Sequence, residues 1–329
     1  MRTLTSRPLA FLPTAGAPRA AAGGATREDG EAGARAEGAE EGWLAAAFAP
    51  AALGERYQLV RELGRGGMGI VLLARDRTLH RVVALKLLHP VLAGSSAARA
   101  RFLREARLQA QLEHPGIVAV HAYGEERLAD GAPLPWFAMP YVAGESLADR
   151  LQRVGRLPAA EVRRIVVALC EALGHAHARG IVHRDLKPEN VLIDAATGRV
   201  LLTDFGVASR PSHDDPRRTA HDAGTPLWMA PEQFAGEHAI DGRTDLYALG
   251  AIAYAMLAGR PPYVAASARA LAVARLTTDA PPLAPLAPRA DGALVAAIER
   301  CLARDAAGRW PRAESLAAAL AARTALGAR

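Results

Sequence analysis

The sequence predicts an α+β fold with two lobes: a small antiparallel-sheet N-lobe with one main helix, and a larger, mostly helical C-lobe. Residues 57–63, 70–76 and 82–88 are rich in apolar and β-branched side chains and are separated by glycine-rich or charged turns, which favours an antiparallel meander. From Pro158 onward, apolar residues recur at helical spacing. Strands that come first and helices that follow, without regular alternation, are typical of the α+β class.

The N-lobe is completed by one helix and two further strands. Ser95 or Ser96 can cap a helix that runs to about Leu112, where a proline and a glycine stop it. Apolar runs at residues 117–123 and 136–139 predict the two strands that follow.

The C-lobe is predicted to begin with a long helix from Pro158 to Gly180. Further helices are expected at residues 244–258, 268–276, 292–303 and 313–325. The predicted domains are therefore an N-lobe at residues 55–142 and a C-lobe at residues 143–325.

Residues 1–54 are mainly Ala, Gly, Arg and Glu, with almost no β-branched or aromatic side chains. Such a segment buries too little apolar surface to offset chain entropy, so we expect a disordered arm.

The composition also indicates a compartment. Cys170 and Cys301 lie in apolar helical patterns, which predicts buried free thiols and a reducing cytoplasm. The longest uncharged apolar run, Leu246–Gly259, has 14 residues, fewer than the roughly 20 that span a bilayer. No membrane span is expected.

The basic residues separate into two groups. The formal net charge is +6, but the arginines are spread along the chain without interleaved aromatic residues, so nucleic-acid binding is not expected. All basic residues except Lys86 and Lys187 are arginine, and Asn190 is the single asparagine. Because a compact ammonium is not interchangeable with a planar guanidinium, we expect these lysines to mark chemistry.

A glycine-rich segment at residues 64–69 matches G-x-G-x-x-G. In dinucleotide-binding folds this motif opens a helix, whereas here a strand follows and no acidic ribose partner stands at the right distance. The pattern predicts a hairpin whose glycine tip lies close to phosphates. Val71 would then cover adenine, and Lys86 would hold the α- and β-phosphates, tethered by Glu105 of the first helix.

The most specific motif is His183-Arg184-Asp185-Leu186-Lys187-Pro188-Glu189-Asn190. Asp185 is placed to accept a proton from a substrate hydroxyl, and Lys187 to neutralise the transferred phosphate. Asn190, together with Asp204 of the Asp-Phe-Gly that lies 14 residues later, supplies the hard oxygen ligands that magnesium prefers.

With these motifs, the chain from about Tyr57 to Arg323 resembles the bacterial eukaryotic-like serine/threonine protein kinases. The resemblance implies ATP and Mg²⁺ as cofactors. It also implies transfer of the ATP γ-phosphate to Ser or Thr hydroxyls of proteins, with autophosphorylation on the activation segment. Lys187, two residues after Asp185, together with Thr225 resembles the serine/threonine rather than the tyrosine branch.

The resemblance also implies the adenine pocket, with Met139 as gatekeeper and residues 140–142 as hinge. The implied nucleotide-contacting residues are Leu63, Gly64, Gly66, Gly69, Val71, Ala84, Lys86, Met139, Pro140, Val142 and Leu192.

Two structural pairings are implied as well. Glu232 would pair with Arg309, and Asp245 would brace the catalytic loop. One departure is Gln109, which stands where eukaryotic members usually place an apolar residue.

For regulation, the resemblance implies that Arg184 recognises a phosphorylated residue on the activation segment. Thr225 is expected to face Asp185 and Lys187 as part of the substrate platform. The segment also offers Ser209, Ser212 and Thr219, of which Ser209 lies too near Asp204. Thr219, six residues before Thr225, stands where bacterial relatives commonly carry a phosphothreonine, so the resemblance implies Thr219 as the predicted phosphosite.

Three alternatives are weaker. A pseudokinase scaffold is disfavoured because the lysine, glutamate, aspartates and asparagine of the motifs are all present. A small-molecule phosphotransferase needs no peptide platform, yet residues 224–232 resemble one. Metal binding by His175, His177 and His183 is a less common arrangement than histidines at a helix end that interact with the helix dipole.

Protein substrates are the expected partners, with activation through a partner, the N-terminal arm or an N-lobe dimer.

Overall fold

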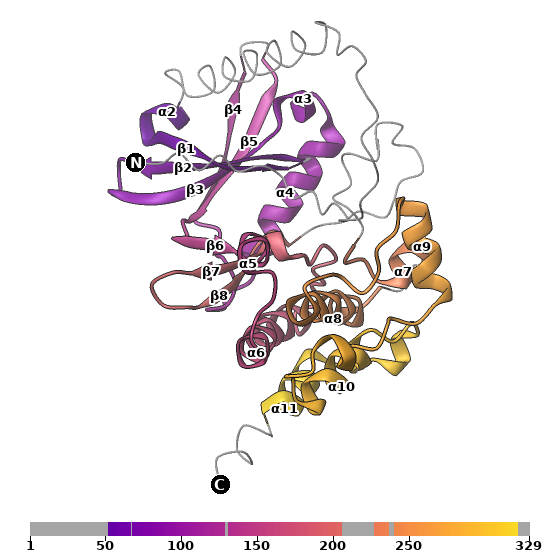
Figure 1. Cartoon of the computed structure of the whole chain (residues 1–329). Coiled ribbons are helices and arrows are strands. Elements are labelled where there is room, and N and C mark those ends of the chain that lie inside the picture. Colours follow the sequence, from indigo (N-terminus) through magenta and orange to yellow (C-terminus); the bar gives the residue numbers. More distant parts are fainter. Residues whose placement is uncertain (1–51, 67, 129–130, 206–226, 237–239, 322–329) are drawn as a thin grey trace, which may run out of the picture. The chain divides into compact units, whose positions relative to one another are not determined.

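The computed structural model describes residues 52–66, 68–128, 131–205, 227–236 and 240–321 (Figure 1). These residues fall into two compact units. The first holds the described residues up to Ser96 together with Gly124–Trp136, and the second holds the remainder. The antiparallel-sheet part and the helical part that the sequence predicts are both present, one in each unit.

The first unit is built around strands. Its elements are α2 (Ala52–Arg56), β1 (Tyr57–Gly66), β2 (Gly69–Asp76), β3 (Arg81–Leu88) and α3 (Pro90–Ala93), with most of β4 (Ala122–Arg127) and the first half of β5 (Pro133–Pro140). Among the described residues, five strands form one sheet in the order β1-β2-β3-β5-β4. The three predicted strands of the meander are confirmed, and β1 pairs antiparallel with β2 as β2 does with β3.

The predicted arm reaches three residues too far. Residues 52–54 belong to α2, and Leu53 is buried. Leu53 follows a long segment of Ala, Gly, Arg and Glu, so its burial could not be recognised from the local composition. Residues 1–51 lie outside the described residues.

The strand predicted at residues 117–123 is wrong in position, because β4 begins at Ala122 and continues to Arg127. Gly124 explains the continuation: a Cβ there would lie 2.3 Å from the Trp136 indole, so only glycine lets the strand pass the ring. Ile117 instead forms an isolated parallel bridge with Leu202, and the N–H of Val118 donates to the Leu202 carbonyl at 2.9 Å.

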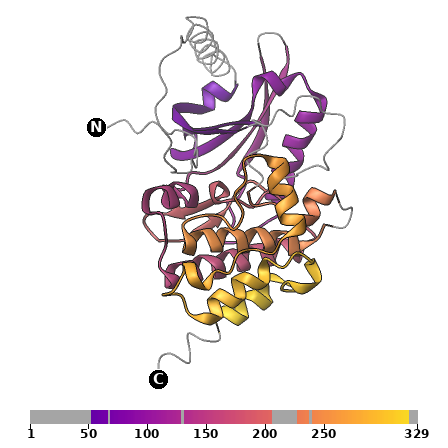
Figure 2. The ribbon, with the colours of Figure 1, turned by 45° about the vertical axis from the view of Figure 1, so that its right-hand side comes forward.

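The second unit is mostly helical (Figure 2). Its elements are all but the first residue of α4 (Ser96–Ala110), then β6 (Gly144–Ser146), α5 (Leu147–Val154), α6 (Ala159–His177), the 3-10 helix η1 (Pro188–Asn190), β7 (Val191–Asp194), β8 (Val200–Leu202), α7 (Pro231–Ala235), α8 (Gly242–Ala258), α9 (Ala268–Thr277), the 3-10 helix η2 (Ala284–Leu286), α10 (Gly292–Cys301), the 3-10 helix η3 (Ala306–Gly308) and α11 (Ala313–Ala321). The predicted helices are confirmed within a few residues at their ends, and residues 322–325 of the last one lie outside the described residues.

The core of this unit is centred on α8, whose residues from Thr244 to Ala258 are all buried. It packs against α6 and α10. A Cβ at Gly250 would lie 2.4 Å from the Cβ of Cys301, so glycine is what allows α8 and α10 to approach this closely.

Both cysteines are buried and free, as the sequence predicts. Burial raises the pKa of the Cys301 thiol to about 12 and raises the pKa of Cys170 as well. These thiols are therefore packing groups rather than nucleophiles. The reducing compartment stays a prediction.

The sequence analysis missed α5 and the small sheet β6-β7-β8. Helix α5 begins with a capping box: the Ser146 Oγ accepts from the Asp149 N–H at 3.1 Å, and the Asp149 carboxylate accepts from the Ser146 N–H at 3.3 Å. This reciprocal pair is a recognised helix-start signal. The three strands are short, and strands of three or four residues give too little alternation to detect.

Among the helices of the described residues, none has both the length and the hydropathy needed to cross a bilayer. Residues 97–123 and 137–142, which were assigned to the N-lobe from the sequence, group with the helical unit. The lobe boundary at residue 142 stays a prediction.

Candidate active site

The loop at residues 183–190 is held by one buried carboxylate. Asp245 on α8 is 1% exposed. Its two oxygens accept from the backbone N–H groups of His183 and Arg184, each at 2.8 Å, and Oδ2 also lies 2.8 Å from His177 Nε2. The expectation that Asp245 braces this loop is confirmed.

Arg184 needs that support because its φ is +64°, in the left-handed region that non-glycine residues rarely adopt. Such strain persists only where surrounding contacts over-determine it. Asp245 accepts the N–H of Arg184, and the Gln233 side chain donates to the Arg184 carbonyl at 2.9 Å. Gln233, on α7, was not singled out by the sequence analysis, since an isolated glutamine carries no local signal.

His183 fixes the loop from inside the unit. It is fully buried, and its Nδ1 accepts from the Asp185 N–H at 3.3 Å while Nε2 lies 3.1 Å from the Thr203 carbonyl. A ring that accepts at Nδ1 must donate at Nε2, which specifies one neutral tautomer. The Phe205 ring packs against it at 4.8 Å between centroids. His183 thus joins the catalytic loop to the segment that contains Asp204.

The side chains of Asp185 and Lys187 on this loop contact each other. Lys187 Nζ lies 2.8 Å from Asp185 Oδ2, with side chains 29% and 46% exposed. Burial lowers the pKa of Lys187, but the charges of Asp185, Glu189 and Asp204 outweigh it and raise the pKa overall. Lys187 therefore stays protonated and Asp185 has a cation beside it.

Asn190 and Asp204 carry the candidate metal-ligating oxygens. Asn190 is buried, and its amide Nδ2 donates to the Asp185 carbonyl at 2.9 Å, which orients the amide and leaves Oδ1 pointing away from that bond. Asp204 has a φ of +56°, a second left-handed position. Its negative charge contributes to the raised pKa of Lys187.

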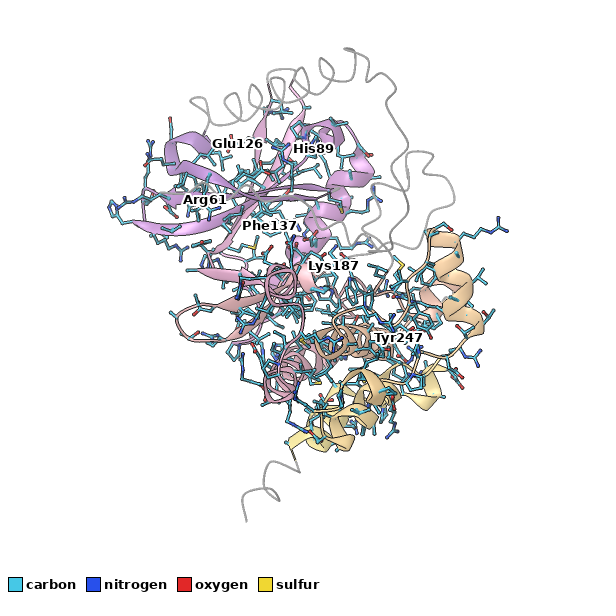
Figure 3. All side chains as sticks on the ribbon, in the orientation of Figure 1. Arg61, His89, Glu126, Phe137, Lys187 and Tyr247 are labelled. Carbon is cyan, nitrogen blue, oxygen red and sulfur yellow. The ribbon has the colours of Figure 1, made fainter. Side chains whose placement is uncertain are left out.

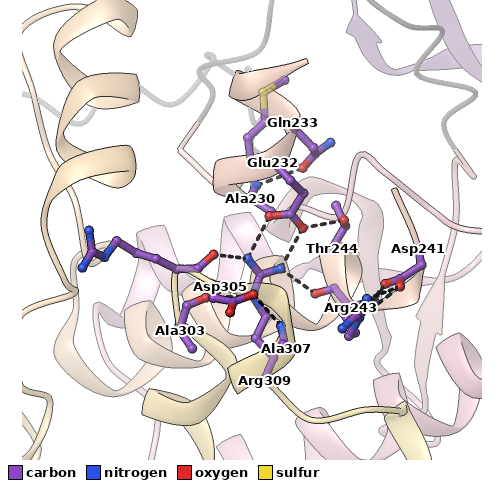
Figure 4. A network of polar contacts seen from close by, with 12 residues as sticks. Ala230, Glu232, Gln233, Asp241, Arg243, Thr244, Ala303, Asp305, Ala307 and Arg309 are labelled. Carbon is purple, nitrogen blue, oxygen red and sulfur yellow. Dashed lines mark hydrogen bonds and ion pairs between the residues drawn. The ribbon is translucent and has the colours of Figure 1, made fainter. Parts of the chain in front are cut away.

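Glu232 and Arg309 form the buried pair that the sequence predicts (Figure 4). Both guanidinium Nη atoms donate to the two carboxylate oxygens, at 2.7 and 2.8 Å, and Thr244 Oγ1 donates to Oε1 at 2.7 Å. Burial raises the pKa of Glu232, but the bonds from Arg309 and Thr244 outweigh it and hold the pKa below its usual range. This pair connects α7 to the chain before α11.

Comparisons with known proteins agree with this geometry. A protein kinase domain family profile matches residues 57–319. The chain belongs to the protein kinase family. The relatives include the serine/threonine-protein kinase PknB of Mycobacterium leprae, 39% identical over 275 residues, covering 82% of this chain and 43% of that protein. They also include PknD of Mycobacterium tuberculosis, 41% identical over 264 residues, covering 80% of this chain and 39% of that protein. The chain thus spans less than half the length of these relatives.

Solved structures show the same likeness. The crystal structure of the Mycobacterium tuberculosis PknI kinase domain has a TM-score of 0.63 and 35% sequence identity, with 84% of this chain and 98% of that chain covered. Because protein kinase domains use ATP, we locate the residues predicted to bind nucleotide in each unit of this chain.

In the first unit of the kinase, β1, β2 and β3 carry the predicted glycines and Lys86. Val71 pairs with Gly64 on one side and with Lys86 on the other. Residues directly opposite on paired strands project from the same face of a sheet, and so do residues two apart on one strand. Val71, Lys86 and Ala84 therefore share one face, as a nucleotide-contacting surface requires.

The glycines of the G-x-G-x-x-G motif differ in their surroundings. A Cβ at Gly69 would lie 2.1 Å from the Leu87 carbonyl oxygen, so β2 can approach β3 here only with glycine. A Cβ at Gly64 or Gly66 would meet no atom of the described residues within 4 Å, which leaves open space beside their backbone. Leu63 lies on β1 between Glu62 and Gly64.

In the second unit of the kinase, the remaining predicted nucleotide residues lie on or next to strands. Met139 and Pro140 end β5, Val142 follows, and Leu192 lies on β7. Met139 is 6% exposed and the other three are half-buried. That the residues of both units contact one nucleotide stays a prediction.

Helix α4 carries Glu105, which is 5% exposed, and Gln109, which is fully buried. The Gln109 amide donates to the Val118 carbonyl at 2.7 Å. That carbonyl satisfies one N–H of the buried amide, whereas Oε1 has no hydrogen-bond partner among the described residues. The contact of Glu105 with Lys86 stays a prediction.

The histidines considered as a metal site have separate partners. His177 contacts Asp245, His183 contacts Thr203, and His175 lies 3.2 Å from an Arg179 nitrogen. No group of three metal-ligating side chains was found among the described residues. Thr219 and Thr225 lie outside the described residues.

Proposed function

We propose that this chain is a serine/threonine protein kinase that transfers the ATP γ-phosphate to Ser or Thr hydroxyls of proteins. The observation that carries the proposal is the Asp185–Lys187 pair, 2.8 Å apart on a loop whose backbone is fixed from both sides. A carboxylate beside a held cation supplies a proton acceptor and a positive charge at one place, which is what phosphoryl transfer to a hydroxyl needs.

Each of these residues has a separate role in the proposed reaction. Asp185 accepts the hydrogen bond, and then the proton, of the attacking hydroxyl. Lys187 balances the negative charge that collects on the transferred phosphoryl oxygens. Lys86, tethered by Glu105, orients the α- and β-phosphates, and the apolar residues around Val71 and Ala84 hold the adenine.

Magnesium fits the donor set of this loop. The amide oxygen of Asn190 and the carboxylate of Asp204 are hard oxygen donors, and the bond from Asn190 Nδ2 to the Asp185 carbonyl leaves the amide oxygen available. Asn190 and Asp204 would hold the ion, which supplies charge neutralisation for the triphosphate when bound.

A small cavity in the second unit lies next to the proposed base. Its lining includes Asp185, Lys187, Trp228 and Met229. Trp228 and Met229 belong to the segment at residues 224–232 that resembles a peptide platform, and this supports a polypeptide rather than a small-molecule acceptor.

The test is incubation of the purified chain with magnesium, labelled ATP and a protein acceptor, followed by phosphoamino-acid analysis. We expect label on Ser or Thr of the acceptor. A nucleotide-binding scaffold would bind ATP without transferring label, and a small-molecule phosphotransferase would label only an added metabolite. Either result would overturn the proposal.

Lys86→Arg is expected to lower turnover at least about tenfold although the charge is kept. Lys86 is 8% exposed on β3, so the bulkier planar guanidinium has little room to take the position of the ammonium. Arg75→Lys, at an exposed position near the far end of the neighbouring strand β2, is the control and should leave turnover unchanged. A Lys86→Arg enzyme with wild-type turnover would refute the assigned role.

Thr219→Ala is expected to lower activity, because we propose that phosphorylated Thr219 forms charge-assisted hydrogen bonds with Arg184. Mass spectrometry of the active protein should find phosphate on Thr219. Ser212→Ala, in the same segment, is the control. If Thr219 carries no phosphate in active protein and Thr219→Ala is fully active, this regulatory role is excluded.

A further inference from the structure

Arg275 is a second arginine that is buried completely in the helical unit. It lies on α9, and its side chain is among the largest in the described residues that are fully excluded from solvent. Burial lowers the pKa of its guanidinium, although the group stays charged at any physiological pH. Excluding such a charge from water is unfavourable unless hydrogen bonds and aromatic faces replace the lost hydration.

The hydrogen bonds of Arg275 go to the segment before α7. Nη1 donates to the Met229 carbonyl and Nη2 donates to the Leu227 carbonyl. The planar fork presents both N–H groups in fixed directions, so it sets the positions of two carbonyls at once. Trp228 lies between Leu227 and Met229, so its main chain is held in place as well.

Three aromatic rings surround the same guanidinium. Its Cζ lies 5.5 Å from the ring centroid of Tyr263, 5.7 Å from that of Phe234 and 5.8 Å from that of Tyr247 on α8. Tyr247 is labelled in Figure 3. These distances are within the range of cation–π attraction. The rings come from α7, α8 and the loop before α9, so the arginine is held by three separate parts of the unit.

The other end of the segment is attached to the catalytic loop. The Ala230 N–H donates to Gln233 Oε1 at 2.9 Å, and Gln233 Nε2 donates to the Arg184 carbonyl at 2.9 Å. Residues 227–230 are thus fixed at one end by Arg275 and at the other by Gln233. Between these points, Trp228 and Met229 line the cavity that also contains Asp185 and Lys187.

We propose that Arg275 is a positioning residue for the protein acceptor: it holds residues 227–229 in the arrangement that receives the chain on either side of the phosphorylated hydroxyl. The inference rests on the proposed function. It concerns acceptor affinity, because the two carbonyls that Arg275 binds belong to the segment beside the acceptor cavity, whereas the residues assigned to ATP lie elsewhere in the chain.

Arg275→Lys is the direct test, since lysine keeps the charge but cannot donate to both carbonyls in the fork geometry. We expect the KM for a single-threonine peptide acceptor to rise about tenfold, as expected for loss of a charged hydrogen bond. The KM for ATP and the rate of ATP hydrolysis without acceptor should stay within about twofold of wild type. Arg269→Lys, an exposed arginine on the same helix, is the matched control and should change none of these.

The readouts separate the outcomes. A merely structural role would lower the active fraction, which reduces kcat and ATP hydrolysis together without changing the acceptor KM, and would overturn the inference. An unchanged acceptor KM in a folded Arg275→Lys enzyme would overturn it as well. If the wild-type enzyme phosphorylates no peptide or protein, the proposed function is wrong, and the inference about Arg275 is then wrong as well.

A second variant covers the case in which Arg275→Lys does not fold. Phe234→Leu keeps the arginine and removes one ring of the aromatic cage, so we expect a smaller rise in the acceptor KM with ATP hydrolysis unchanged. A Phe234→Leu enzyme with the wild-type acceptor KM would contradict the role assigned to Arg275.

Discussion

Asp185→Asn is expected to lower the rate of phosphoryl transfer at least about a hundredfold, the usual contribution of a positioned base. The fold should be unaffected, because the bonds that hold this residue in the loop use its main chain. Its N–H donates to His183 Nδ1 and its carbonyl accepts from Asn190 Nδ2. The carboxylate itself is 46% exposed and contacts Lys187. ATP affinity, measured by titration calorimetry, should stay close to that of the wild type.

Glu189→Gln is the matched control for this prediction. It removes the same charge from the same loop, but at an exposed position that we assign to neither nucleotide nor acceptor. It should keep most of the wild-type rate. An Asp185→Asn enzyme that transfers phosphate as fast as Glu189→Gln would show that Asp185 is not the base.

Arg309→Met is expected to lower the free energy of unfolding by about 3–5 kcal/mol, the range for removing one partner of a buried ion pair. Arg309 is 1% exposed and Glu232 is 8% exposed. The substitution removes both guanidinium bonds to the Glu232 carboxylate and leaves the bond from Thr244, and it also removes the donors to the carbonyls of Ala303 and Arg304. Urea unfolding followed by circular dichroism measures the change.

Two comparisons make this prediction specific. Arg304→Met removes an exposed pair with Asp279, with side chains 43% and 82% exposed, and should cost at most about 1 kcal/mol. The double variant Glu232→Gln with Arg309→Met should be destabilised by less than the sum of the two single changes, because it leaves no buried unpaired charge at this pair. Strict additivity would contradict the assigned pairing.

The pair also predicts a pH dependence. The folded pKa of Glu232 is lowered, so between its folded and unfolded pKa values the unfolded state binds more protons and stability falls as the pH falls. This contribution is fully present above the ordinary glutamate pKa, near 4.3. It is lost on acidification below that value. Arg309→Met should lack this part of the acid-induced loss of stability.

Much of the fold could be predicted from local patterns. Strands β1, β2 and β3 are apolar runs set off by glycine-rich or charged turns, and α6 and α8 carry long apolar stretches, so each specifies its own structure. Strand β4 was misplaced because its course depends on the passage of Gly124 over Trp136. That contact joins positions in different strands, and neither residue reveals it alone.

The candidate site divides in the same way. Residues 183–190 and Asp204 are recognisable because phosphoryl transfer needs those side chains at close, fixed spacing along the chain. The contacts that hold them are not local: Gln233 reaches Arg184 across 49 positions, and Asp245 reaches His183 across 62. The sequence around a glutamine or an aspartate on a helix does not indicate which distant residue its side chain will contact.

By itself the sequence determined where we expect the chemistry to lie, because in a chain with 38 arginines and only two lysines we predict that Lys86 and Lys187 stand at positions that a guanidinium cannot fill. The tertiary structure alone decided which arginines are buried and which groups they contact. Arg275 resembles its many exposed counterparts in sequence, and it acquires a role only because α9 packs its side chain among three aromatic rings and against the carbonyls of Leu227 and Met229. Burial and partner choice depend on contacts between distant segments, and these form only when the helices pack together.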